Sequence, residues 1–174
     1  MMPIKVRLQN KLVAVYSSPL GPIGITLYHN QLSGLQFLVG KKIHSTKLYE
    51  KTLLIRQLFD ELSRYFDYPK HPFNIALHIE GTPFQKRVWE TLQTIPSGTT
   101  LTYGVLAKKL HTSPRAIGQA CRMNRIPIII PCHRVVAAHH TGGYMGHSVG
   151  AVAKVKEQLL QHEISPITPQ RAKC

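Results

Sequence analysis

Acidic residues are scarce in this chain of 174 residues. It has 8 Asp and Glu against 22 Lys and Arg, so its formal net charge is +14 at pH 7. The balance is +5 over residues 1–80 and +9 over residues 81–174. A surplus of this size indicates a polyanionic partner, most simply nucleic acid, and a merely soluble basic surface is the alternative. No run of Lys and Arg exceeds two residues, which excludes a disordered basic tail as the source of the charge.

Long apolar runs and cysteine clusters are also missing. The longest aliphatic stretches, such as 12–15 and 128–130, are far too short to cross a bilayer, and the N-terminus has no apolar signal-peptide segment. We therefore expect a soluble protein without a membrane partner, cytoplasmic in a prokaryote or nuclear in a eukaryote. The three cysteines, Cys121, Cys132 and Cys174, cannot all pair, and they lack the spacing of a zinc site. The sequence thus predicts a reducing compartment and no metal.

The chain divides near Gly81 into two parts of different pattern. Before it, three short segments bounded by Gly, Pro and Asn (12–17, 23–28 and 35–39) are predicted strands. An amphipathic helix over 51–66 and a last strand over 73–80 follow. After it, a capping box at 82–85 begins a helix that runs to about Thr94. We expect an N-terminal domain over 1–80, a C-terminal domain over 81–165 and a flexible tail over 166–174.

Two short helices are predicted at 102–110 and 114–123, joined by a three-residue turn. This spacing is typical of a helix-turn-helix, although an αα-hairpin without a nucleic-acid role shows the same pattern. The second helix carries Arg115 and Arg122 beside small residues that include Gly118. A glycine inside a helix costs about 1 kcal/mol against alanine. Close approach to a groove would compensate for it, as would packing of two helices, and the arginines favour nucleic acid.

The segment Ile130-Pro131-Cys132-His133-Arg134-Val135 carries the strongest chemical signal. A thiol attacks only as the thiolate and its ordinary pKa is about 8.5, so it needs a base or a cation beside it. A free cysteine among β-branched residues is more often a small buried hydrophobe, but the adjacent His133 and Arg134 make a nucleophile an equal alternative, which the rest of the sequence has to decide. Because Pro131 ends the strand-like run 126–130, we expect Cys132 at an exposed turn.

With these segments the chain resembles the O6-alkylguanine-DNA alkyltransferases, also called methylated-DNA–protein-cysteine methyltransferases. The Pro-Cys-His-Arg motif at 131–134 is that family's active-site signature. The other matching stretches, in the same order and spacing, are 81–85, 88–89, 95–96, 98–100, 103–104, 106–107, 115–116 with 118, 124–136, 156–157, 159–160 and 162–163. The match is nearly continuous from residue 81 to 163, whereas the N-terminal part agrees only in length and strand pattern.

The resemblance implies an α/β protein of two domains. The N-terminal domain would be ribonuclease-H-like, and the mainly helical C-terminal domain would be a winged helix with the helix-turn-helix. It implies DNA repair without a cofactor: binding in the minor groove, flipping of O6-alkylguanine out of double-stranded DNA, and irreversible transfer of the alkyl group to Cys132, once per molecule. Because the sequence carries no oligomerisation signal, we expect a monomer. Chemistry on a base inside a duplex does require its extrusion. Whether O4-alkylthymine is also accepted stays open.

The resemblance also implies residue roles. His133 would act as the base through a bridging water, Glu163 would orient it, Tyr103 would donate a proton to the leaving guanine, and Asn124 would support the turn. Arg115 would fill the space that the flipped base leaves. The implied DNA contacts are Thr102, Tyr103, Arg115, Ala116, Gly118 and Arg122. The implied pocket residues are Cys121, Arg134, Val135, Tyr144, Met145 and Gly146.

Some positions depart from the family pattern. Met145-Gly146-His147 stands where a small residue and two glycines are usual, and it would narrow the pocket. Cys121 replaces a larger apolar residue and would offset part of this narrowing, and Arg125 stands where proline is common. Three other functions are weighed against repair: a reader of alkylguanine that does not repair it, a sequence-specific regulator, and a Cys-His hydrolase. An intact Cys132 speaks against the first, and the basic composition gives no support to the last.

Overall fold

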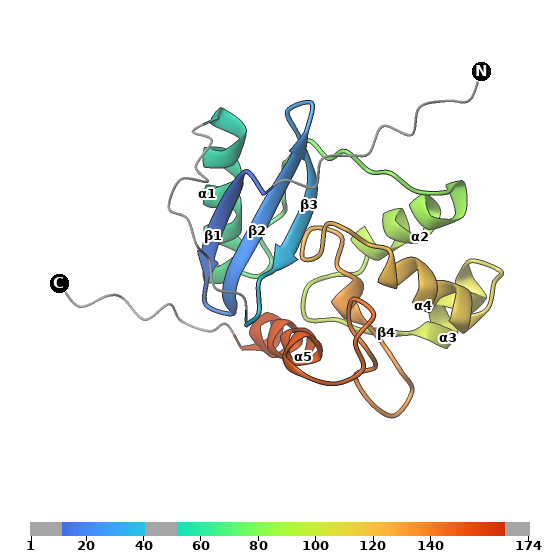
Figure 1. The fold of residues 1–174 in the computed structure, drawn as a ribbon. Helices are drawn as coiled ribbons and strands as arrows, with labels where there is room; N and C mark the ends of the chain where they lie inside the picture. The colour runs from blue at the N-terminus through green and yellow to red at the C-terminus, as the bar shows by residue number, and fades with distance from the viewer. Residues whose placement is uncertain (1–11, 41–51, 166–174) are drawn as a thin grey trace, which may run out of the picture.

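The first part of the chain is a small antiparallel sheet with one helix. A computed structural model describes residues 12–40 and 52–165 (Figure 1). Strands β1 (Ala14–Ser18), β2 (Gly21–Tyr28) and β3 (Gln31–Phe37) form a sheet in the order β1-β2-β3. His29 and Asn30 both have positive φ angles, which is the two-residue turn that suits the twist of a hairpin, and they join β2 to β3. The predicted strands therefore exist, with β3 beginning earlier than expected.

Helix α1 (Leu53–Asp67) packs on this sheet. Thr52 caps its N-terminus by accepting a hydrogen bond from the backbone of Ile55. Its apolar face buries Leu58, Leu62, Tyr65 and Phe66, which recur at the three- and four-residue spacing that predicted the helix. The ring of Tyr16 on β1 stacks on Phe66. This layer brings Tyr65 toward the second part of the chain.

Four helices and a short strand pair build the second part. Helix α2 (Pro83–Gln93) begins with the predicted capping box, α3 (Tyr103–Lys109) and α4 (Pro114–Arg122) form the predicted helix-turn-helix, and α5 (Ala151–Ile164) ends the described chain. Strand β4 (Leu101–Thr102) pairs in parallel with β5 (Val135–Val136). Strand β5 directly follows the short 3₁₀-helix η1 (Cys132–Arg134). Trp89 on α2 donates to the backbone oxygen of Ala120 on α4. One buried apolar cluster runs through both parts, from Ala14 to Leu159.

Two sequence predictions about strands are wrong. The segment 126–130 forms buried turns, not a strand, and Ile128 has a φ of 73°. Segment 73–80 alternates inward and outward as predicted, but it makes only an isolated bridge, Leu32 with Leu77. An alternating pattern reports which side chains face the core, whereas a strand also needs a partner backbone along its length.

Two further expectations concern membrane-spanning helices and the C-terminal tail. Within the described ranges 12–40 and 52–165, no helix is long and apolar enough to cross a membrane. The predicted flexible tail over 166–174 lies outside the described residues.

Candidate functional site

Cys132 lies at a cavity of about 150 Å³ between α4, η1 and the loop that precedes α5. The side chain is only 3% exposed, so the expectation of an exposed turn is wrong. The thiol is reached through the cavity and not across an open surface. The cavity lining consists of Tyr103, Gly118, Cys121, Arg122, Cys132 and residues 143–146.

Asn124 explains why the chain buries Cys132. Its side-chain oxygen accepts a hydrogen bond from the backbone of Ile126, and its amide nitrogen donates to the backbone oxygen of Ile130. The same nitrogen lies 3.1 Å from the sulfur of Cys132 and donates to it. Asn124 thus closes the turns over 126–130 and orients the thiol. The expectation that this residue supports the turn agrees with its contacts.

Glu163 is the centre of a buried network behind Cys132. Its Oε1 accepts from His133 Nε2 at 2.7 Å and from the hydroxyl of Tyr65 at 3.0 Å. Arg134 donates to both carboxylate oxygens, through Nε at 3.2 and 3.0 Å and through Nη2 at 2.9 Å. The backbone of Gly98 donates to Oε2 at 3.0 Å. Residues from α1, η1, α5 and the α2–β4 connection therefore meet at one carboxylate.

The network fixes the protonation of His133. Burial opposes ionisation of Glu163, but the hydrogen bonds from His133 and Arg134 and the charge of Arg134 outweigh it and hold the pKa of Glu163 well below its usual range. Burial lowers the pKa of His133, more than the bond to Glu163 raises it. A neutral His133 that bonds an ionised carboxylate must carry its proton on Nε2. Its buried Nδ1, which has no hydrogen-bond partner among the described residues, then presents a free lone pair.

Lys156 is a functional candidate that the sequence analysis missed. It is fully buried, and its Nζ donates to the backbone oxygens of Val135 at 2.6 Å and Gly143 at 3.1 Å. It also lies 5.6 Å from the centre of the Tyr103 ring. Burial lowers its pKa to about 8, against the opposing effect of the Cys132 and Cys121 charges. A cation of this kind links the cavity loop to β5, and its charge lowers the pKa of the Cys132 thiol.

Opposing interactions act on the pKa of the Cys132 thiol. Burial raises its pKa, while the hydrogen bond from Asn124 and the charge of Lys156 lower it. The raised value means that the thiol is held mainly protonated at neutral pH, so that forming the thiolate requires a proton acceptor. Burial also raises the pKa of Cys121, which the nearby Cys132 charge raises further.

The predicted pocket residues separate into two groups. Cys121, Tyr144, Met145 and Gly146 line the cavity with Cys132. Arg134 and Val135 are not among the lining residues. The guanidinium of Arg134 turns to Glu163 and the backbone oxygen of Ile95, because a residue two positions after Cys132 in a 3₁₀-turn faces another direction.

Residues 144–147 form a tight turn at the edge of the cavity. The backbones of Tyr144 and His147 exchange two hydrogen bonds of 2.8 Å. Met145 and Gly146, between them, both have positive φ angles, 49° and 86°. The Met145 side chain lines the cavity, whereas the exposed His147 does not. Of the two residues expected to narrow the pocket, only Met145 lies where it can do so.

The predicted DNA contacts lie along α3 and α4. Arg115 and Arg122 are exposed, while Ala116 and Gly118 are half-buried on the same helix. Gly118 lines the cavity, and a Cβ atom there would be in ordinary van der Waals contact with the Tyr103 ring, at 3.9 Å. Thr102 caps α3 by accepting from the backbone of Val105 and so has a structural role at this point.

Comparisons with known proteins cover nearly the whole chain. The family described as 6-O-methylguanine DNA methyltransferase, DNA binding domain, matches residues 83–165. A methylated-DNA–protein-cysteine methyltransferase of Methanosarcina acetivorans is 38% identical over 154 residues, which is 86% of this chain and 96% of the relative.

Solved structures give the same result. The Mycobacterium tuberculosis O6-methylguanine methyltransferase matches at 32% identity and a TM-score of 0.72, over 89% of this chain and 93% of that one. The same organism's protein in complex with DNA matches at 31% identity and a TM-score of 0.67, over 87% of this chain and 92% of that one. The α/β fold is therefore shared over both parts of the chain.

Proposed function

The chain belongs to the methylated-DNA–protein-cysteine methyltransferase family and repairs DNA by alkyl transfer to a cysteine, and we propose that Cys132 is that cysteine. The observation that carries the proposal is its position. Among the described cysteines, only Cys132 combines a place in the cavity with a hydrogen bond to its sulfur and a histidine–glutamate pair directly behind it. Cys121 shares the cavity but has no such partners.

DNA binding is assigned to the helix-turn-helix. The M. tuberculosis relative has been solved in complex with DNA, and the family match is to a DNA-binding domain. We infer that α4 enters the minor groove of double-stranded DNA, with Ala116 and Gly118 allowing close approach and Arg122 meeting phosphates. The alkylated guanine leaves the stack and enters the cavity, since its reacting carbon is out of reach within the duplex. Arg115 takes the space of the extruded base.

Transfer begins with removal of the thiol proton. His133 accepts it at Nδ1 through a bridging water, because the other nitrogen is occupied by Glu163. The thiolate, stabilised by Asn124 and Lys156, attacks the alkyl carbon of O6-alkylguanine. A carbon–sulfur bond forms, the carbon–oxygen bond breaks, and its electron pair stays on guanine.

Tyr103 completes the reaction by protonating the leaving guanine. Burial raises the pKa of Tyr103, so its hydroxyl is still protonated when the guanine leaves. The phenolate that remains takes a proton back from water, and His133 releases to water the proton that it took from the thiol. The product is a thioether on Cys132. A thioether has no hydrolytic exit, so the reaction is irreversible and each molecule acts once, without a cofactor.

We further propose how the chain divides into two domains. The sheet with α1 corresponds to a ribonuclease-H-like domain over 1–80, and α2–α5 with the β4–β5 pair correspond to a winged-helix domain over 81–165. The proposal is supported by the position of the three-stranded sheet and of the helix-turn-helix on opposite sides of residue 81. We propose a monomer that acts on O6-alkylguanine in double-stranded DNA, and O4-alkylthymine is the second substrate to test.

The test is the intact mass of the protein after incubation with a duplex that contains O6-methylguanine, followed by peptide mapping. We expect one methyl group per molecule, on Cys132. The Cys132→Ala variant should gain none while Cys121→Ala still reacts at Cys132. A methyl group on Cys121 would overturn the assignment. Binding of the lesion without any adduct would instead favour a reader that does not repair.

A further inference from the structure

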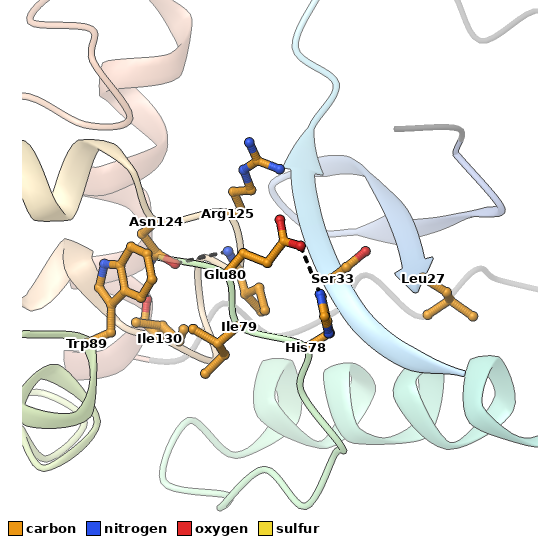
Figure 2. Close-up of a pocket in the computed structure, with 10 residues that line it drawn as sticks. Leu27, Ser33, His78, Ile79, Glu80, Trp89, Asn124, Arg125 and Ile130 are labelled. Atoms are coloured by element: carbon orange, nitrogen blue, oxygen red, sulfur yellow. Dashed lines mark hydrogen bonds and ion pairs between the residues drawn. The ribbon is translucent and has the colours of Figure 1, made fainter. Parts of the chain in front are cut away.

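The substrate cavity continues into a groove that the reaction does not use. This groove, of about 350 Å³, shares Arg122 and Met145 with the substrate cavity. At its other end it shares Ser33, Asn124 and Arg125 with a smaller cavity (Figure 2). We call it the sheet groove, because β2 and β3 form one of its walls. It leads from Cys132 along the junction between the sheet and α4.

The two walls of the sheet groove differ in character. On the sheet side are the hydroxyl groups of Thr26 and Ser33 and the amide of Gln36. On the other side are Arg122 and Arg125, both exposed. Within residues 12–40 and 52–165, no acidic residue lines the groove, and neither arginine forms an ion pair.

The neighbouring small cavity contains an acidic group, Glu80. Figure 2 shows Glu80 directed to His78, and the two side chains are 3.3 Å apart. Among the described residues, no ion pair joins Arg125 to Glu80. The guanidinium of Arg125 is therefore not held by this carboxylate.

Backbone contacts fix the base of Arg125. Its carbonyl oxygen accepts a hydrogen bond of 2.9 Å from the backbone of Leu35 on β3. Gly34 permits this approach: a Cβ atom there would lie 3.4 Å from the same oxygen and 2.5 Å from Thr26 Oγ1. The residue is thus anchored to the sheet while its charged end is free to bind.

The arginines form a row that begins on α4. Arg115 and Arg122 are seven residues apart and so lie on the same side of the helix, about 10 Å apart along its axis. Arg125 follows three residues later and meets the sheet. The row runs from the start of α4, past the mouth of the substrate cavity, into the sheet groove.

We propose that Arg125 and the sheet groove bind the phosphodiester backbone of the DNA strand that carries the flipped nucleotide. Arginine forks match phosphate oxygens in geometry and charge, and hydroxyl and amide groups add neutral donors. The N-terminal sheet then forms part of the DNA-binding surface and holds the strand where it leaves the helix-turn-helix. This inference rests on the proposed function, since it takes the nucleotide in the substrate cavity as its starting point.

The experiment is a binding titration of Arg125→Ala against a lesion duplex at several salt concentrations. Each phosphate contact contributes about 0.9 to the slope of log K against log salt concentration. We expect the variant to bind several-fold more weakly and its slope to fall by about that amount. Arg125→Lys should keep most of the slope because it keeps the charge. Arg56→Ala, which removes an exposed arginine of α1, is the matched control and should bind like the wild type.

A second series locates the contact. Phosphates beside the lesion are replaced one at a time by neutral methylphosphonates, and each duplex is titrated with the wild type and Arg125→Ala. We expect one position at which the two losses are not additive, because either change removes the same contact. Additive losses at every position, or an unchanged salt slope, would overturn the inference. Methyl transfer by the wild type is measured in parallel, so a failure of the proposed function is recognised separately.

Discussion

Behind Cys132, one carboxylate accepts hydrogen bonds from four residues, whereas the cavity in front of it is lined mostly by uncharged groups. Glu163, His133 and Lys156 are buried on the inner side and each has a fixed partner. On the cavity side, Cys121 and Met145 are neutral, and the one charged side chain among the lining residues, Arg122, is exposed. In the proposed mechanism, the inner side determines the reactivity of the sulfur, and the outer side determines which alkyl group reaches it. Substitutions on the inner side should therefore change the reactivity of the sulfur, and substitutions on the outer side should change the range of alkyl groups that react.

Glu163→Gln should have the largest effect. It leaves Arg134 buried without its carboxylate, and breaking a buried pair in this way costs about 3–5 kcal/mol. Alkyl transfer should also fall, because His133 loses the partner that fixes its proton on Nε2. Chemical denaturation and single-turnover kinetics measure the two losses. The exposed Glu157→Gln on the same helix is the control.

The stability difference should depend on pH in a defined direction. The pKa of Glu163 is depressed in the folded state, so its contribution is complete above the unfolded value of about 4.3 and disappears as the pH falls through the folded value. The wild type should therefore approach the Gln variant in acid. A difference that stays constant from neutral to strongly acidic pH contradicts this account of the network.

Tyr103→Phe tests the proposed proton donor on the cavity side. Loss of the proton donor should slow alkyl transfer by about a hundredfold, the usual range for removing a general acid. Stability should change little because the ring, which makes the packing contacts, remains. Rapid-quench kinetics on a lesion duplex give the rate, with Tyr68→Phe, whose residue is 60% exposed, as the control. A rate within twofold of the wild type would remove Tyr103 from the mechanism.

Lys156→Met should make the reaction more dependent on pH. The Lys156 charge lowers the pKa of the Cys132 thiol, so its loss should slow transfer about tenfold near neutral pH and less in alkaline solution. The variant should still fold, since methionine fills much of the same space. The pH–rate profile checks this, with the exposed Lys154→Met as the matched control on α5. Equal loss at every pH points to a positional role instead.

Stability offers a second readout for Lys156. Burial lowers its folded pKa to about 8. Between that value and the unfolded value of about 10.4, the unfolded chain holds the proton that the folded chain has released, so the wild type should gain stability with pH relative to Lys156→Met. Denaturation across this window measures the difference.

Met145→Gly should have the smallest effect and only on substrate range. The backbone at Met145 is in the left-handed region, where a side chain costs about 1–2 kcal/mol, so relief of strain opposes the lost packing and the greater freedom of the unfolded chain. Net stability should move by less than about 1 kcal/mol. Benzyl transfer should accelerate several-fold relative to methyl transfer, as the cavity widens. His147→Gly, in the same turn but outside the cavity, should leave that ratio unchanged.

Local signals in the sequence predicted most of the elements. Thr82 and Gln85 form both hydrogen bonds of the capping box that the sequence indicated, and Pro114 begins α4 as expected. These signals work because the groups that decide the structure are within four residues of one another. The motif at 131–134 and the helix-turn-helix could be recognised for the same reason.

What the sequence did not predict depends on distant partners. The sequence of the run 126–130 is compatible with a strand. The run forms turns instead, because the side chain of Asn124 binds the backbone groups of Ile126 and Ile130 at its two ends. Lys156 has the appearance of a solvated lysine on an amphipathic helix, because the carbonyl groups that bind it come from Val135 and Gly143. Arg134 next to the cysteine suggested the pocket, and only the fold brings Glu163 within its reach.

The hydrogen bond from Tyr65 to Glu163 joins residues 98 positions apart, and this separation has a consequence for synthesis on the ribosome. Cys132, His133 and Arg134 are translated before α5 exists. Until Glu163 emerges and docks, no carboxylate fixes the His133 proton. A translation product that ends before α5 therefore lacks the carboxylate that orients the proposed base.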